Sequence, residues 1–250
     1  DLMPSDITGT EVIQEDKSSG TRELRFLPGP VFGNIILADE INRTPPKTQA
    51  ALLEAMQEHQ VTVGGRNHPV PEPFFVLSTQ NPNEQECTYP MTEAQLDRFM
   101  FNVLIDYPTY ADEVNIVEAT TGSTETELAK VLGAAQVLAS QGLVRQVPVA
   151  ENITSYAVRL VRATRVGSGE EAGPAAEYLA WGAGPRAAQF LIRGAKTRAL
   201  LDGRPTPDLD DVRRLALPVL RHRLVSNFHA EAENVSKDKI VGMILAEVAP

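Results

Sequence analysis

The sequence predicts an α/β domain followed by an all-helical domain, and two observations carry this expectation. Before Pro108, short apolar runs rich in Val, Ile and Phe alternate with turn residues, a pattern typical of strands joined by turns and helices. After Pro108, the apolar residues recur with the spacing of amphipathic helices. This change places the domain boundary at residue 108, with predicted domains at 1–108 and 109–250.

The composition fits a protein with a substantial core. Of its 250 residues, 42% are hydrophobic and 22% are charged, which excludes a largely disordered chain. The net charge of −10 disfavours general nucleic-acid binding, because that affinity comes mainly from neutralising phosphates. No apolar run approaches the roughly 18 residues of a membrane span, and no signal peptide opens the chain. The lone Cys87 excludes an intrachain disulfide framework. We therefore expect a soluble, cytoplasmic protein.

Three segments of the first domain are predicted strands. Residues 31–38 are mostly apolar and end on Asp39 and Glu40, and a run that is apolar on both faces suits a central strand of a covered parallel sheet. Residues 74–79 form a second buried strand by the same criterion, and residues 102–105 are a third candidate. The sequence therefore predicts a parallel sheet covered by helices.

A helix and two hairpins lie between these strands. Thr44 is a suitable N-cap and Pro45 a favoured first helical residue, so we expect a helix from there to about His59. Alternating residues that turn on Gly64-Gly65 predict a hairpin at 60–70. We also predict a hairpin at 11–27 and a helix at 92–101. In the second domain, helices are expected near 111–121, 124–140, 150–165, 174–180, 185–202, 208–220 and 236–248.

Asp39 and Glu40 form an acidic pair at the carboxyl end of the first predicted strand. Open α/β sheets bind their ligands at that end of the strands. One carboxylate can hold a Mg²⁺ ion that keeps several of its waters, and its neighbour can take a proton from an attacking water. This is the Walker B pattern, although an acidic pair after a strand also fits a helix cap or a solvated turn.

Three further polar residues are candidates, each with an alternative. Asn81 follows the second predicted strand, where its amide can bind an attacking water or a γ-phosphate, or can start a turn. Arg98, at the end of a predicted helix, can reach a phosphate across a subunit boundary or pair with a nearby acid. Arg186 falls in the first turn of a helix, where the helix dipole disfavours a cation unless an anion is near. Its alternative is a solvated turn residue.

Five segments occur together in the order and spacing of one known family. They are residues 4–10 (PSDITGT), 37–47 (LADEINRTPPK), 79–85 (TQNPNEQ), 93–99 (EAQLDRF) and 219–223 (VLRHR). Together they resemble the MoxR family of AAA+ ATPases, over nearly the whole chain. The resemblance implies an AAA+ P-loop NTPase core, with a parallel sheet and helices, followed by an all-helical lid. It also identifies the two hairpins with the family's two inserts.

The resemblance implies a role for each candidate residue. Asp39 corresponds to the Walker B aspartate that holds Mg²⁺ through water, and Glu40 to the catalytic base. Asn81 corresponds to sensor 1, which orients the attacking water. Arg98 corresponds to the arginine finger, which acts on the ATP of a neighbouring subunit. Arg186 corresponds to the sensor 2 arginine of the lid, acting on its own nucleotide or a neighbour's. The implied cofactors are ATP and Mg²⁺.

The family's phosphate-binding loop, of the form Gly-x4-Gly-Lys-Ser/Thr, does not occur in these 250 residues. We expect it to precede Asp1, so that the sequence is the latter part of a longer ATPase. The nearest internal match, at residues 194–197 (GAKT), has Ala195 in place of the glycine and falls inside a predicted helix. Without the loop's backbone and lysine, we expect the chain alone to bind ATP weakly or not at all.

For the intact protein, the resemblance implies a ring oligomer, a hexamer in this family. It implies ATP hydrolysis that drives chaperone-like remodelling or maturation of a protein client, often beside a partner with a von Willebrand factor A domain. Two other classes remain open. One is an interaction or scaffold fragment without ATPase activity. The other is a DNA-remodelling AAA+ motor, which the net charge of −10 disfavours.

Overall fold

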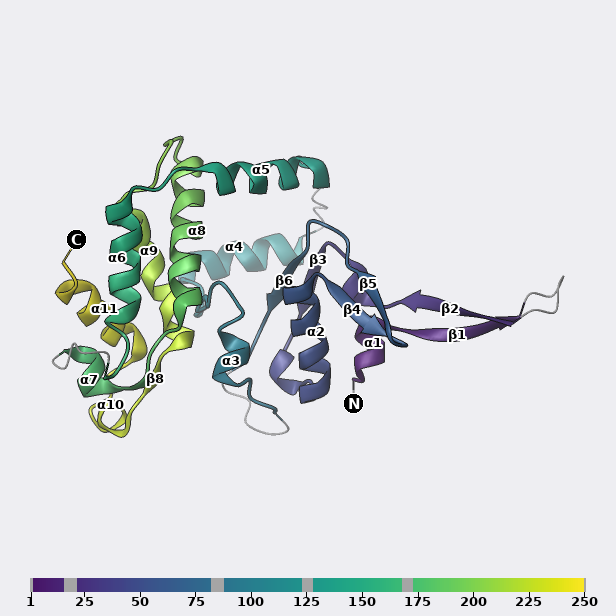
Figure 1. Cartoon of the computed structure of the whole chain (residues 1–250), viewed down its shortest axis with the longest axis horizontal. Coiled ribbons are helices and arrows are strands. Elements are labelled where there is room, and N and C mark those ends of the chain that lie inside the picture. Colours follow the sequence, from purple (N-terminus) through teal and green to yellow (C-terminus); the bar gives the residue numbers. More distant parts are fainter. Residues whose placement is uncertain (1, 16–21, 82–87, 123–127, 168–172, 250) are drawn as a thin grey trace. The chain divides into compact units, whose positions relative to one another are not determined.

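The computed structural model of the chain describes residues 2–15, 22–81, 88–122, 128–167 and 173–249. Cys87 and the tip of the hairpin at 11–27 lie outside these ranges. The chain divides into two compact units, Asp1–Phe99 and Met100–Pro250 (Figure 1). The division falls upstream of the boundary predicted at residue 108. The reason is that the Asn102 amide donates to the Pro218 carbonyl at 2.8 Å, which ties the start of the second unit to its own helices.

The first unit is built around two parallel strands, β3 (Ile35–Ala38) and β6 (Phe75–Ser78), paired from Ile35↔Phe75 to Ala38↔Ser78. Helix α2 (Pro46–Glu58) follows β3 in the chain. The core of the unit includes Val31, Ile41, Leu52, Leu53 and Val61. The prediction that both faces of the strand are buried is wrong for the described structure. Ile35 and Leu37 are 71% and 64% exposed, because only every second side chain of β3 faces that core.

Two hairpins extend this unit and confirm the sequence-based expectation. Strands β1 (Gly9–Glu15) and β2 (Arg22–Pro28) pair antiparallel, as do β4 (Gln60–Val63) and β5 (Arg66–Pro69). The ring of Phe26 in β2 stacks on that of His68 in β5, with centroids 3.8 Å apart. The two hairpins are therefore packed against each other. The remaining elements are α1 (Pro4–Thr8) and the 3-10 turns η1 (Pro30–Phe32) and η2 (Ile41–Arg43).

Three predictions for this part of the chain need correction. The helix expected at 92–101 is the short α3 (Glu93–Leu96). The N-cap of α2 is Pro45, because Thr44 closes the 3-10 turn η2 instead. The expected strand at 102–105 is absent from the described residues, and Ile105 there is 91% exposed. An apolar run forms a strand only where another strand accepts its backbone bonds, and this segment pairs with none that the structure describes.

The second unit is mainly helical. Its elements are α4 (Tyr110–Thr121), α5 (Ala134–Gln146), α6 (Glu151–Arg162), α7 (Pro174–Tyr178), α8 (Pro185–Leu201), α9 (Leu209–Leu220), η3 (Arg221–Arg223), α10 (Phe228–Ala232) and α11 (Lys237–Glu247), with short strands β7 (Leu179–Trp181) and β8 (Val225–Ser226). Figure 1 shows α6, α8 and α9 side by side, and α8 and α9 form the most extensive helix contact. The helix predicted at 124–140 begins only at Ala134, with 123–127 outside the described residues. The elements α10, β7 and β8 were not predicted.

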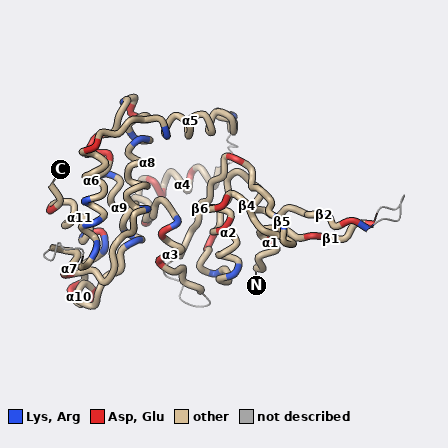
Figure 2. Tube along the Cα trace, in the orientation of Figure 1, with Lys and Arg blue, Asp and Glu red and all other residues tan. Residues whose placement is uncertain are grey.

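The described helices of the second unit differ in charge. Helix α4 carries acidic residues only and α8 basic residues only, whereas α9 and α11 carry both. Both signs also occur on the β1–β2 hairpin (Figure 2), where Arg22 lies 3.8 Å from Glu15. Among the described helices, none combines the length and the apolar character that crossing a membrane requires.

Candidate functional site

The candidate site lies where β3 and β6 end. The two strands run parallel, so their carboxyl ends meet at one edge. The backbone pairing continues one residue beyond both strands, because the Thr79 amide donates to the Ala38 carbonyl and the Ile41 amide to the Thr79 carbonyl, each at 3.1 Å. Asp39 and Glu40 therefore sit directly beside Thr79. This is the end of an α/β sheet at which ligands bind.

A single hydroxyl joins the two acidic residues. The Oγ1 of Thr79 donates to Oδ1 of Asp39 at 2.5 Å and accepts from the Glu40 amide at 2.8 Å. Asp39 is exposed and Glu40 is half-buried. The acidic pair is thus held at the surface by a residue from the neighbouring strand.

Glu40 has an unusual backbone and a cationic partner. Its φ and ψ are both 48°, in the left-handed region that residues with a Cβ seldom occupy. Its carboxylate accepts from Nη1 of Arg43 at 2.8 Å, and the Arg43 amide donates to the Glu40 carbonyl at 2.8 Å. Strained backbone conformations of this kind concentrate at functional sites. Arg43, in the next turn of the chain, therefore holds both the carboxylate and the carbonyl of Glu40.

The donor chemistry of this edge fits a magnesium ion. Asp39, Glu40 and Thr79 offer only carboxylate and hydroxyl oxygens, which are the ligands that Mg²⁺ prefers. Among the described residues there is no cluster of three or more His, Cys, Asp or Glu that would enclose a metal. A Mg²⁺ ion bound through one carboxylate, with waters and substrate phosphates completing its shell, needs no such cluster.

Two other predicted residues belong to the same unit. Asn81 follows Thr79 by two positions and is half-buried. Arg98 comes two residues after the end of α3, in a turn where its amide donates to the Gln95 carbonyl at 3.2 Å. The structure thus places Asp39, Glu40 and Asn81 at the ends of adjacent strands, and Arg98 after the next helix.

Arg186 belongs to the second unit, in the first turn of α8 behind Gly184 and Pro185. The segment before it is held firmly to the end of α6. The Ala183 amide donates to Thr164 Oγ1 at 2.9 Å, and a Cβ on Gly182 would lie 2.0 Å from the Thr164 carbonyl oxygen. Only glycine fits such a close backbone approach. The position of Arg186 along α8 is therefore fixed by the residues that follow α6.

Known proteins match both units. Residues 1–101 match the model of the ATPase family associated with various cellular activities (AAA), and residues 172–244 match the AAA lid domain. The chain is 39% identical over its whole length to the chaperone MoxR1 of Mycobacterium tuberculosis, covering 65% of that protein. It is also 39% identical to YeaC of Bacillus subtilis, with 99% of the chain aligned to 74% of that protein.

The chain belongs to the MoxR family of AAA+ ATPases. The predicted AAA+ fold with a helical C-terminal region is confirmed as well. The crystal structure of a candidate ATPase from Cytophaga hutchinsonii matches all of this chain and 74% of its own, with a TM-score of 0.88 at 39% identity. The chain spans about two thirds of MoxR1 and three quarters of YeaC.

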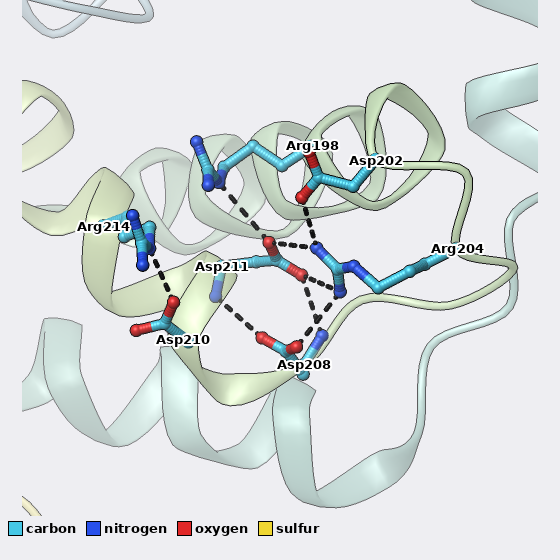
Figure 3. A pocket seen from close by; sticks show the side chains of 7 residues that line it. All are labelled: Arg198, Asp202, Arg204, Asp208, Asp210, Asp211 and Arg214. Atoms are coloured by element: carbon cyan, nitrogen blue, oxygen red, sulfur yellow. Dashed lines mark hydrogen bonds and ion pairs between the residues drawn. The ribbon is translucent and has the colours of Figure 1, made fainter.

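The MoxR lid also contains a polar pocket that sequence reasoning missed. It lies between α8 and α9 and is lined by Arg198, Asp202, Arg204, Asp208, Asp210, Asp211 and Arg214 (Figure 3). At its centre is Asp211, which is 2% exposed. Both of its oxygens accept from the Arg204 guanidinium, at 2.7 and 2.8 Å.

The environment of Asp211 determines its ionisation. The hydrogen bonds from the Arg204 guanidinium, opposed by burial, hold the pKa of the Asp211 carboxyl below its usual range. Asp208 and Asp211 also cap α9 reciprocally, since each accepts from the other's amide, at 2.9 and 3.0 Å. The protein supplies every observed partner of this carboxylate, so the cluster has the chemistry of a structural support for the α8–α9 turn.

Thr79 is the other residue that sequence reasoning passed over. It stands in the segment at 79–85 that carries the family resemblance, but a threonine at a strand end has no distinctive pattern of its own. The capping of α9 had a readable signal, an Asp three residues before another Asp at the start of an amphipathic helix.

Proposed function

We propose that the full-length protein is an ATPase in which Glu40 is the general base and Asp39 the Mg²⁺-holding residue. The observation that carries the proposal is the pair of carboxylates at the carboxyl end of β3, joined through Thr79 to the end of β6. Membership of an ATPase family supports the reaction class. The predicted reaction converts ATP and water to ADP and phosphate.

In this mechanism, the residues of the first unit act on the attacking water. Asp39 would hold Mg²⁺ through water, and the ion when bound would neutralise charge on the nucleotide's phosphates. Glu40 accepts a proton from the attacking water. Asn81 hydrogen-bonds the same water through its amide and orients it. Arg43, paired with Glu40 at 2.8 Å, limits the directions in which the Glu40 carboxylate can point.

Two arginines supply positive charge to the phosphates. We assign Arg98 to the ATP of a neighbouring subunit, as an arginine finger, and Arg186 to a nucleotide near the start of α8. A cation in the first turn of a helix opposes the helix dipole, and the phosphates of a nucleotide beside Arg186 would offset that opposition. A finger acting between subunits requires a ring oligomer, for which we propose a hexamer.

We further propose that the ring remodels or matures a protein client, beside a partner with a von Willebrand factor A domain. The support is the naming of two relatives: one is a chaperone, and a more distant one, GvpN of Ancylobacter aquaticus, is a gas vesicle ATPase that is 26% identical over 121 residues. The net charge of −10 gives no support to a DNA motor.

The test is Glu40→Gln in the full-length protein. The amide cannot accept the proton, so we expect steady-state ATP turnover to fall by about 100-fold or more, while binding of a fluorescent ATP analogue persists. The matched control is Glu58→Gln, which makes the same change at an exposed position at the end of α2 and should leave turnover unchanged. Unchanged turnover in Glu40→Gln would overturn the role of Glu40.

A further inference from the structure

Thr79 makes more hydrogen bonds to residues 38–41 than the pairing of two strands requires. Its backbone amide and carbonyl bond to Ala38 and Ile41, which continues the parallel ladder. Its side chain adds two further bonds, to Oδ1 of Asp39 at 2.5 Å and from the Glu40 amide at 2.8 Å. Thr79 therefore bonds to four consecutive residues of the other strand's end, and its hydroxyl serves the two that carry carboxylates.

The direction of these two bonds is fixed by the chemistry of a hydroxyl. A threonine Oγ1 has one proton to donate and two lone pairs that accept. The Glu40 amide can only donate, so it must occupy a lone pair. The hydroxyl proton then goes to Oδ1 of Asp39. One oxygen of Asp39 is thereby engaged, whereas its second oxygen, Oδ2, has no hydrogen-bond partner among the residues that the structure describes.

The same hydroxyl supports the backbone of Glu40. A left-handed conformation, with φ of 48°, is disfavoured for a residue with a Cβ. It persists only where the surroundings hold it. Here the Glu40 amide is held by Thr79 Oγ1 and the Glu40 carbonyl by the Arg43 amide, both at 2.8 Å. Losing the hydroxyl would release one of these two anchors.

We propose that Thr79 is a positioning residue for ATP hydrolysis. Its single hydroxyl fixes the carboxylate of Asp39 and the backbone of Glu40 relative to each other, so that the Mg²⁺-holding group and the general base keep one geometry. The inference rests on the proposed function, because it presumes that Asp39 and Glu40 act on the magnesium–nucleotide. It adds a residue whose effect passes through its two neighbours rather than through contact with substrate.

Thr79 is exposed, so its role can be separated from packing. Thr79→Val replaces the hydroxyl by a methyl of similar size and removes both side-chain bonds. Thr79→Ser keeps the hydroxyl and removes the methyl. Thr62→Val is the matched control, since Thr62, in β4, is also an exposed threonine of this unit whose Oγ1 donates to a carboxylate, that of Glu54, at 2.9 Å.

The experiment measures ATP turnover of the full-length variants against ATP and against Mg²⁺ concentration, with melting temperatures alongside. For Thr79→Val we expect kcat to fall by about 10- to 100-fold, the scale of a misplaced catalytic group, with little change in KM for ATP. We also expect a higher half-saturating Mg²⁺ concentration. Thr79→Ser should restore most of kcat, and Thr62→Val should match the unchanged protein.

The outcomes separate this inference from the proposed function. If Glu40→Gln loses turnover but Thr79→Val keeps it, the role of Thr79 is overturned and the ATPase proposal stands. A second outcome also overturns the inference. If Thr79→Val lowers both kcat and the melting temperature, and Thr79→Ser brings neither back to the value of the unchanged protein, Thr79 is a structural residue. If the unchanged full-length protein hydrolyses no ATP, the proposed function fails and this inference fails with it.

Discussion

Asp39 and Asp211 differ in burial, and this difference separates a candidate ligand-binding carboxylate from one that stabilises the α8–α9 turn. Asp211 is 2% exposed, and both of its oxygens bond to one guanidinium from the same unit. Asp39 is exposed, and one of its oxygens bonds to a threonine hydroxyl. The charge of Asp211 is compensated by Arg204. The carboxylate of Asp39 is oriented by Thr79, and its other oxygen has no hydrogen-bond partner among the described residues. Substitutions should therefore affect folding at Asp211 and activity at the edge of β3 and β6.

The largest effect is expected at Arg98, on activity alone. Arg98→Ala in the full-length protein should lower ATP turnover by about 1,000-fold or more, the scale of an arginine finger, with little loss of nucleotide binding. Mixing the variant with Glu40→Gln subunits tests whether Arg98 acts between subunits, because each variant then carries the part that the other lacks. A finger acting in trans should give the mixture more turnover than either variant alone. A mixture no more active than the two variants alone would contradict a finger acting in trans.

A smaller effect, on stability alone, is expected at Asp211. Asp211→Ala leaves the Arg204 guanidinium without its central partner and removes a cap of α9, so we expect a loss of about 2–4 kcal/mol in the free energy of unfolding. Urea denaturation measures it. The control is Asp210→Ala on the same helix, whose pair with Arg214 is exposed by more than 60% on both sides. It should cost less than about 1 kcal/mol. Equal losses of unfolding free energy in Asp211→Ala and Asp210→Ala would show that burial does not distinguish the two carboxylates.

The smallest effect is the pH dependence of the stability that Asp211 contributes. The pKa of Asp211 is lower in the folded protein than in the unfolded chain, because Arg204 bonds to the charged form. Its contribution is therefore complete above the unfolded value of about 4 and is lost as pH falls through the lower folded value. The urea midpoint of the unchanged protein should decline over that acidic range more steeply than that of Asp211→Ala. Parallel declines would contradict the assignment.

The sequence predicted those features whose signals are local. The two hairpins follow from alternation around Gly64-Gly65 and around residues 18–20, and the edge of β3 follows from an apolar run that ends in two acids. The α/β and helical domains followed from the change of apolar pattern near Pro108, and the AAA+ fold from the family segments. The prediction failed at residues 102–105, where an apolar run has the composition of a strand but no partner strand among the described residues. Short elements such as α10 carry too few residues to show a period.

The roles of Thr79 and Asp211 required the structure for a different reason. Thr79 meets Asp39 only because β3 and β6 pair in one register, 40 positions apart in the chain, and no pattern in either strand specifies that register. Asp211 is identifiable as a cap from its spacing to Asp208, but its burial depends on how α8 and α9 pack. The proposed roles of Glu40, Asn81, Arg98 and Arg186 stay predictions, and the experiments above test those of Glu40 and Arg98.

Gly182 gives the lid a fixed reference point for Arg186. Because a side chain there would collide with the Thr164 carbonyl, the chain that leads into α8 is seated on the backbone just after α6. A displacement of the Thr164 backbone would therefore move the start of α8, and with it the arginine proposed to sense nucleotide.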